Sequence, residues 1–528
     1  MRYDYVIIGA GSAGCVLANR LSEDPSCQVA LIEAGGVAPA EFSMPPAAAN
    51  RLQQTSYDWA FQTTPQKNLL DRRIAWPRGR VLGGSSMLNY VVYIRGNRGD
   101  FDNWSRLGAE GWDFNGVLPY FRRAETNAVY RNKFHGRNGP IHVENQRYRH
   151  DELCDAYFEA AQQAGIQFNA DLNGADQDGC GYFQATTRNG KRCSSAEAYL
   201  EPALTRANLT LIRDSRALQI QCRRHRATGV SIATRAGQTE TVSAAQEVIC
   251  SAGAVGSPHL LLLSGIGPAE HLAANRISVV ANVPGVGRNL QDHLGGFGLR
   301  VRIKNPKLHF PYRDALFQDL YDDYRISGGG PLSTNNLEAG AFVRTSPLSD
   351  YPDTQLFLVS GLPGDYRKDG DTGNAHFYLS SYVGRPKSRG SVSLLCNDPT
   401  APPLIDPNYL AHPDDLIQSI KGIRKNLDIL CQPGFDRVRA VGEYQFSNGP
   451  TDADLEAFVR QNATTVWHPT STCAMGVGTD AVVDATLRVR GIDNLRVCDA
   501  SVMPTIVTGN TNAATIMLAE KGADLVRE

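Results

Sequence analysis

The first 35 residues contain two continuous apolar runs separated by a glycine-rich turn and a stretch of small side chains. The segment YDYVII is followed by GAGSAG, then by small residues, a second apolar run QVALI and an acidic residue. Continuous apolar runs without alternation are typical of parallel strands that are buried on both faces. The pattern predicts a β-α-β unit over residues 3–35.

The rest of the chain changes character twice. Dense glycine and proline punctuation at 76–96, and a glycine cluster at 251–268 after a strand-like 247–250, indicate backbone that approaches a ligand. From about residue 300 to 450 the pattern consists of shorter strand-like stretches broken by Pro and Gly, such as 354–359, 375–382 and 391–395. The final part returns to an α/β pattern, with a strand-like 494–498 and a helical 512–527.

These patterns predict a protein of mixed α/β and α+β class, with a Rossmann-like cofactor-binding domain and a second, sheet-containing substrate-binding domain. Because the α/β pattern occurs at both ends of the chain, we expect the first domain to be discontinuous. The expected division gives residues 1–155, 190–300 and 455–528 to the cofactor domain, and 156–189 and 301–454 to the substrate domain.

Length and charge narrow the possible functions. A chain of 528 residues is too long for one hydrophobic core and suggests two or three folding units. Its 53 basic residues nearly cancel its 54 acidic ones, which disfavours nucleic acid and anionic membranes as partners. No apolar run reaches the roughly 18 to 20 residues that cross a bilayer, so we expect no membrane span. The first strand begins within three residues of Met1, too early for a signal peptide, and we expect a cytoplasmic protein.

Cysteine and histidine spacing does not suggest a metal centre. The two nearest of the eleven cysteines, Cys15 and Cys27, are 12 residues apart, so there is no CxxC pair and no disulfide framework. The eleven histidines include no HExxH and no pair at helical spacing. We expect reduced, mostly buried thiols and no metal.

The turn after the first strand carries a dinucleotide fingerprint. Gly9, Gly11 and Gly14 form GxGxxG, in which the first glycine permits the tight turn, the second lets a pyrophosphate approach and the third lets the helix pack on the strand. Glu33 ends the second strand 19 residues after Gly14, where it can accept hydrogen bonds from an adenosine ribose. The fingerprint alone does not separate NAD from FAD, because both contain the ADP half.

Several further motifs resemble those of the glucose-methanol-choline (GMC) oxidoreductases, over residues 3 to about 525. They are WPRGRVLGGSSMLN (76–89), GAVGSPHLLLLSGIGP (253–268), GVGRNLQDH (285–293), HPTSTCAMG (468–476) and CDASVMPTIVTGNTNAATIMLAEKGAD (498–524). The resemblance implies FAD as the cofactor. Some family members link a histidine covalently to the flavin, but Leu88 stands at that position here, so we expect non-covalent FAD.

The fingerprint and the resemblance together imply a set of cofactor-binding positions spread over the whole chain. These are Gly9, Gly11, Ser12, Ala13, Gly14, Glu33, Ala34, Arg80, Gly83, Gly84, Ser85, Asn89, Ala217, Ala252, Gly253, Asp499, Ala500, Thr511 and Asn512. The resemblance also directs the start of the last helix at the flavin, where its positive end would favour negative charge on the reduced ring.

The resemblance points to His468 as the base that removes the hydroxyl proton of an alcohol, a role that suits a side chain whose pKa lies near neutrality. It implies Asn512, 44 residues later, as the partner that orients the substrate oxygen; an amide cannot itself be the base. His293 is the main rival, and we interpret it as part of a packed turn. His259 and Cys473 are interpreted as packing residues.

The substrate is less determined than the chemistry. Val466 and Trp467 are candidate substrate residues, because VWH before the motif is similar to hydroxymethylfurfural-type oxidases and favours a primary aromatic or furan alcohol with oxygen as acceptor. The alternative is a dehydrogenase of aliphatic alcohols, sorbose or choline that uses a quinone-type or dye acceptor; a hydroxynitrile lyase is a more remote one. Four aromatic residues of the substrate domain line the pocket or belong to the core: Phe357, Phe377, Tyr378 and Tyr382.

Overall fold

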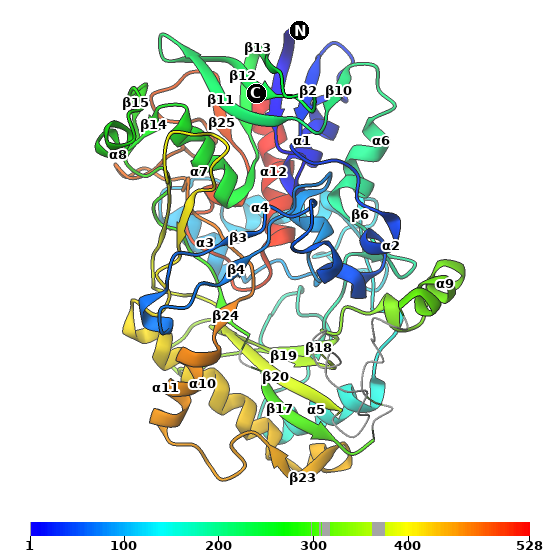
Figure 1. Ribbon diagram of the computed structural model, residues 1–528. Helices are drawn as coiled ribbons and strands as arrows, with labels where there is room; N and C mark the ends of the chain where they lie inside the picture. The colour runs from blue at the N-terminus through cyan, green and yellow to red at the C-terminus, as the bar shows by residue number, and fades with distance from the viewer. Residues whose placement is uncertain (1, 297, 306–307, 309–316, 362–374) are drawn as a thin grey trace.

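Two sheets organise the chain in the computed structural model, which describes residues 2–296, 298–305, 308, 317–361 and 375–528 (Figure 1). In the view of Figure 1 the first sheet lies at the top with both chain termini, and the second lies at the bottom. The α/β and α+β class predicted from the sequence is confirmed.

The first sheet has a parallel centre with an antiparallel extension. Its order is β10-β2-β1-β13-β12-β11, and β25 pairs in parallel with the end of β13. The strands are β1 (Arg2–Ile8), β2 (Val29–Ile32), β10 (Leu209–Ile212), β11 (Arg216–Arg223), β12 (Arg226–Ala233), β13 (Thr239–Cys250) and β25 (Leu495–Val497). Because the parallel strands run the same way, their carboxyl ends meet at one edge, which is where a ligand binds in open α/β sheets.

Helices from both ends of the chain cover this sheet. The helix α1 (Ser12–Leu21) packs against α12 (Thr511–Arg527), and the two lie side by side in Figure 1. Glu520 of α12 is fully buried and binds Arg20 at 2.8 Å, Arg123 at 2.7 Å and the Tyr199 hydroxyl at 2.7 Å. A buried carboxylate with three hydrogen-bonding partners is a stable arrangement, whereas removal of one charged partner would leave unpaired charge.

The second sheet is antiparallel and contributes the other wall of the site. Its order is β23-β17-β20-β19-β18-β7; the short β16 pairs with β20, and β24 pairs with β16. The strands are β7 (Gly179–Tyr182), β16 (Leu294–Gly295), β17 (Leu299–Ile303), β18 (Ala339–Val343), β19 (Thr354–Val359), β20 (His376–Val383), β23 (Arg439–Tyr444) and β24 (Thr464–Thr465). The predicted strands at 354–359 and 375–382 therefore lie side by side in its centre. β16 and β24 come from ranges assigned above to the cofactor domain; the residue-by-residue division remains a prediction.

The remaining elements connect and cover the two sheets. The other helices are α2 (Ala40–Ser43), α3 (Arg98–Arg106), α4 (Phe114–Ala124), α5 (Asp151–Gln163), α6 (Glu201–Ala203), α7 (Gly253–Leu263), α8 (Ala269–Ala274), α9 (Phe317–Ser327), α10 (Pro413–Leu430) and α11 (Asp452–Asn462). Two-stranded ribbons are formed by β3 (Phe61–Gln62) with β4 (Ala75–Trp76), β5 (Glu125–Asn127) with β6 (Ile141–Val143), β8 (Thr187–Arg188) with β9 (Lys191–Arg192), β14 (Ile266–Gly267) with β15 (Ala281–Asn282), and β21 (Ser391–Ser393) with β22 (Leu404–Asp406).

The described residues contain no helix that is both long and apolar enough to cross a membrane. All eleven cysteines are free, and seven of them are buried. Within the same residues, no group of three or more His, Cys, Asp or Glu side chains is arranged to hold a metal ion.

Candidate active site

A cavity of about 520 Å³ lies between the two sheets and extends from the glycine-rich turn after β1 to His468. It is lined by the carboxyl ends of β1, β2 and β13, by the 84–92 loop, by β19 and β20, and by the segments before and after His468. Segments more than 400 residues apart in the sequence thus form one site.

Glycines give this cavity its floor. Gly9 has φ +96°, and a Cβ added there would lie 2.6 Å from the Ser251 carbonyl oxygen, so only glycine fits the turn. A Cβ on Gly84, which has φ +52°, would lie 2.7 Å from Gly11 Cα. The nucleotide turn and the 83–87 turn are therefore in backbone contact, which leaves room for a planar cofactor above them.

Three helices begin at the cavity edge; α1 and α12 have no side chain capping their first N–H groups, whereas the first N–H of α7, that of Gly253, donates to Asp499 at 2.8 Å. Gly11 precedes α1, Ala252 precedes α7 and Asn510 precedes α12, and all three of these positions line the cavity. The free N–H groups and the helix dipole make such ends favourable for anionic groups. A pyrophosphate and a flavin ring that becomes negative on reduction both fit this lining, so the residues present are suited to FAD.

Two buried carboxylates organise the nucleotide end. Glu33 accepts hydrogen bonds from Ala10 N–H at 2.8 Å and Gly35 N–H at 2.9 Å, and its burial raises the pKa of the carboxyl to about 7. Asp499 accepts from Gly253 N–H at 2.8 Å and from the Ser257 hydroxyl at 2.5 Å; burial raises its pKa as well. Both carboxylates line the cavity while also fixing the loops on which it depends.

Most of the predicted cofactor positions lie around this cavity, but three do not line it. Gly14 packs under the turn, since a Cβ there would lie 1.8 Å from the Gly9 carbonyl oxygen. Gly83 donates its N–H to the Ala10 carbonyl at 2.7 Å. Arg80 is exposed and lies over the Trp59 ring at 5.2 Å. These three shape the walls from behind. The predicted residues that line the cavity are Gly9, Gly11, Ser12, Ala13, Glu33, Ala34, Gly84, Ser85, Asn89, Ala217, Ala252, Gly253, Asp499, Ala500, Thr511 and Asn512, with Val466, Trp467 and His468.

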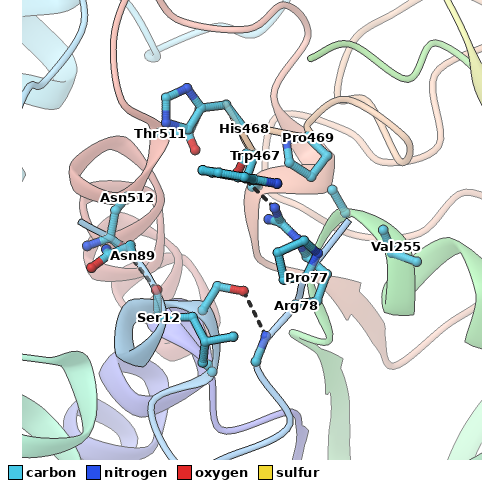
Figure 2. Close-up of a pocket in the computed structure, with 18 of the residues that line it drawn as sticks. Ser12, Pro77, Arg78, Asn89, Val255, Trp467, His468, Pro469, Thr511 and Asn512 are labelled. Carbon is cyan, nitrogen blue, oxygen red and sulfur yellow. Dashed lines mark hydrogen bonds between the residues drawn. The ribbon is translucent and has the colours of Figure 1, made fainter. Parts of the chain in front are cut away.

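His468 lies at the opposite end of the cavity from the glycine turn, close to the start of α12 (Figure 2). Its Nδ1 is 2.9 Å from Nδ1 of His293, and its Nε2 is 3.2 Å from Nδ2 of Asn510. Burial, then His293, then Arg78 hold the pKa of His468 well below its usual value, so the imidazole is neutral at physiological pH.

The hydrogen bonds of His293 decide which nitrogen of His468 is free to take a proton. His293 Nε2 is 3.0 Å from the Gly384 carbonyl, which can only accept, so this nitrogen carries the hydrogen. Burial lowers the pKa of His293 to about 3, and in the neutral ring Nδ1 must then accept. His468 therefore donates from Nδ1 and keeps a lone pair on Nε2, the tautomer that a base at the cavity requires.

This contact corrects the interpretation of His293 as a packing residue of a turn. The side chain is fully buried and does bind backbone, as expected, but it also contacts the predicted base directly. The NLQDH motif and HPTSTC lie 175 residues apart, and spacing alone cannot show that strands β16 and β24 bring them together.

The structure places Asn510, and not Asn512, within hydrogen-bonding distance of His468. The Oδ1 of Asn512 accepts the Ser12 hydroxyl at 2.7 Å and so joins the first residues of α1 and α12. Both asparagines belong to the GNTN segment, in which the resemblance implies Asn512 as the partner. Asn510 precedes the helix, where the extended backbone directs its side chain toward His468.

Support behind His468 comes from Asp292 and Arg78. Asp292 accepts the His468 N–H at 2.7 Å and the Thr465 hydroxyl at 2.5 Å, and burial raises its pKa to about 6. Arg78 donates to the Trp467 carbonyl at 2.9 Å, a contact that is drawn in Figure 2. Trp467 has φ +62°, a strained conformation for a tryptophan, and strain of this kind persists only where neighbours over-determine it.

Aromatic side chains surround the His468 end of the cavity. Phe357 and Tyr378 line it, whereas Phe377 packs against Phe435 and Tyr382 stacks on His293 at 4.4 Å. Alternation along β20 separates Phe377 from Tyr378, since neighbouring residues of a strand face opposite sides; Tyr382 lies on the same face as Tyr378, further along the strand. Tyr90 adds an unpredicted aromatic, stacked on Trp467 with ring centroids 6.1 Å apart. His259, interpreted above as packing, lines the cavity at its other end, where burial and then Arg216 lower its pKa to about 4.

Comparison with known proteins places this site in a family. Family models described as GMC oxidoreductase match residues 3–295 and 386–519. The chain is 42% identical to "Oxygen-dependent choline dehydrogenase 1" of Chromohalobacter salexigens, with 99% of this chain and 95% of the relative covered. It is 40% identical to the mitochondrial choline dehydrogenase of Mus musculus, covering 99% and 89%. Among solved structures, pyridoxine 4-oxidase from Mesorbium loti matches with TM-score 0.88 and 31% identity, covering 99% and 98%.

The chain belongs to the GMC oxidoreductase family. It is an FAD-dependent alcohol oxidoreductase that acts on CH–OH donors, as the sequence motifs predicted.

Replacement of single residues should separate the roles of the three polar side chains. Because Nε2 is the free base, His468→Ala should lower turnover by roughly 10² to 10⁴ fold with FAD still bound. Asn510→Ala should lower kcat/KM by roughly 10² fold, the cost of one lost donor at a reacting oxygen. Asn512→Ala removes the same atoms two residues away and serves as the matched control; it should act mainly on FAD affinity. Equal losses of kcat/KM in both asparagine variants, measured by steady-state kinetics on FAD-saturated enzyme, would show that the pairing is wrong.

The pH profile should reflect the lowered pKa of His468. The base works in its neutral form, so activity is lost as pH falls through its pKa, and a pKa below 6.5 moves this loss to the acid side. We expect kcat/KM to stay constant from neutral pH down through the ordinary histidine pKa of about 6.5 and to fall only below it. An acidic limb centred at or above the ordinary histidine pKa would contradict the assignment.

Proposed function

We propose that the protein oxidises a primary alcohol carried on an aromatic or furan ring to the aldehyde, with non-covalent FAD and His468 as base. The observation that carries the substrate class is the lining of the His468 end, where Tyr90, Trp467, Phe357 and Tyr378 supply flat apolar surface. Among the described lining residues, the carboxylates are Glu33 and Asp499, both at the nucleotide end. A flat, neutral ring is favoured at such a surface.

The geometry supports a simple division of the chemistry. A hydroxyl placed between His468 Nε2 and Asn510 Nδ2 can donate its proton to the imidazole while its oxygen accepts from the amide. FAD supplies the acceptor for the hydride that leaves the carbon, so the alcohol loses one proton and one hydride and becomes an aldehyde. The proton is held at Nε2, and the Nδ1 contact with His293 keeps the ring in place.

Non-covalent attachment is supported by Leu88, which stands where a histidine would form the bond. Its side chain packs with Leu52 and Val81 in a small apolar cluster and also lines the cavity. An alkyl side chain cannot form a covalent link to the ring. Precipitation of the protein in acid should therefore leave the flavin absorbance in the supernatant. If the yellow colour remained with the washed precipitate, the proposal of non-covalent FAD would be wrong.

A second candidate, choline, is favoured by the names of the relatives. Aromatic rings can hold a quaternary ammonium by cation–π attraction, so the same lining has to be tested against a cationic alcohol. No described residue that lines the His468 end of the cavity is a carboxylate, since Asp292 lies behind the lining, and this argues for the neutral alcohol. We infer oxygen as the acceptor, supported by the VWH segment and by the oxidase name of a structural relative; a quinone-type acceptor is the alternative.

An anaerobic panel of alcohols, scored by bleaching of the flavin absorbance, tests the substrate class. Benzyl alcohol and 5-hydroxymethylfurfural should reduce the flavin at least about ten times faster than choline does at equal concentration. The reason is that burial of the choline cation without a carboxylate costs more free energy than a tenfold difference in rate requires. The matched control is 3,3-dimethylbutan-1-ol, the neutral isostere of choline, which should react at least as well as choline. A strong preference for choline over this isostere would establish cation recognition and overturn the proposal. Bleaching by none of the alcohols would favour a lyase, and hydrogen peroxide on admission of air would support an oxidase.

A further inference from the structure

Arg192, next to the 84–92 loop that lines the cavity, is buried and has no carboxylate partner among the described residues. Arg192 ends the short strand β9 and has a relative exposure of 2%. Its guanidinium donates to three carbonyls, those of Ser43 at 3.1 Å, Ser86 at 3.1 Å and Asn89 at 2.7 Å. Its Nη2 is buried and has no hydrogen-bond partner among the described residues.

This charge differs from other buried arginines of the molecule. Arg95 contacts Glu125 at 2.5 Å and Arg496 contacts Glu247 at 2.6 Å, whereas the described residues provide no carboxylate within ion-pair distance of Arg192. Burial of a cation without a partner costs several kcal/mol, so an arginine in this position is unfavourable for folding alone. Burial lowers its pKa to about 10, and it therefore remains protonated at neutral pH.

Arg192 is connected to the cavity through Asn89, a residue of the 84–92 loop that lines it. Its Nη1 also donates to Asn89 Oδ1 at 2.7 Å, and Val91 N–H donates to the same oxygen at 3.2 Å. With the oxygen occupied, the amide nitrogen of Asn89 is the end left to donate to a group in the cavity. The loop of Ser85, Leu88 and Asn89 thus has a fixed positive charge directly behind it.

We propose that Arg192 is a positioning residue for the flavin: its uncompensated charge favours the negative charge that the isoalloxazine gains with the hydride, and it orients Asn89 as a donor. The inference rests on the flavin site of the proposed function but not on the identity of the alcohol. The uncapped start of α12 supplies partial positive charge at the same cavity, so the two sources act together.

The reduction potential of the bound flavin tests this charge directly. It is measured on holoenzyme by coupled reduction with a reference dye, without any alcohol. Arg192→Gln should shift the reduction equilibrium toward oxidised flavin by on the order of 10 fold, as expected for a unit charge roughly 10 Å away at an effective dielectric constant of about 20. For a two-electron couple this corresponds to a potential lower by about 30 mV. Arg192→Lys, which keeps the charge, should restore most of the shift.

A control variant separates charge behind the cavity lining from the loss of any arginine that binds backbone carbonyls. The half-buried Arg72 also donates to carbonyls, those of Leu69, Arg460 and Ala463, but none of these three residues lines the cavity, whereas Asn89 does; Arg72→Gln should leave the potential unchanged. An unchanged potential in Arg192→Gln would overturn the proposal, and so would an equal fall in Arg192→Lys at the acid end of the pH range, where the lysine keeps its proton.

If the glutamine variant does not retain FAD, the lysine variant still decides the question. A buried lysine loses its proton within roughly pH 6 to 10, because burial lowers its pKa. The potential of Arg192→Lys should then fall below that of the wild type as pH rises through this range, and parallel pH curves would overturn the inference. The potentials are measured without any alcohol, so they do not depend on the outcome of the alcohol panel. Either proposal can therefore be contradicted while the other stands.

Discussion

The site depends on three helix N-termini that open at one edge of the first sheet. The parallel strands β1, β2 and β13 end there, and α1, α7 and α12 begin there; α1 and α12 have no side-chain caps, and the first N–H of α7 donates to Asp499. Uncapped N–H groups are unfavourable in a dry interior unless a ligand satisfies them, so this edge is completed by an anionic cofactor. Glu520 and the Ser12–Asn512 contact hold the first and last helices together, and with them both ends of the chain.

The cavity has two chemically different ends. Its nucleotide end contains the charged and small residues, with Glu33 and Asp499 buried and bonded to backbone N–H groups. Its other end contains one neutral base, His468, among aromatic rings. Low polarity at that end keeps the pKa of the imidazole low and excludes water from the transferred hydride. Positive charge lies in the cavity wall at Arg78 and Arg216, and behind the wall at Arg192.

A series of hydrogen bonds from the second sheet fixes the orientation of the His468 ring. The Gly384 carbonyl fixes the hydrogen of His293, and His293 in turn fixes the tautomer of His468. Asp292 binds the His468 backbone N–H, so ring and main chain are held independently. The second sheet therefore contributes to catalysis through position as well as through the shape of the pocket.

The sequence by itself determined the elements and the chemistry that local spacing controls. Glycine positions, continuous apolar runs and the motif order were sufficient for the nucleotide fold and for FAD, since turns and buried strands depend on nearby residues. The same motifs led to the proposal of His468 as the base. The tertiary structure decided which residues are in contact across long sequence separations. His293 contacts His468, Asn510 rather than Asn512 contacts His468, and Arg192 contacts Asn89. These contacts depend on how two sheets and distant loops pack, and a one-dimensional spacing cannot specify which of two neighbouring side chains turns toward a cavity.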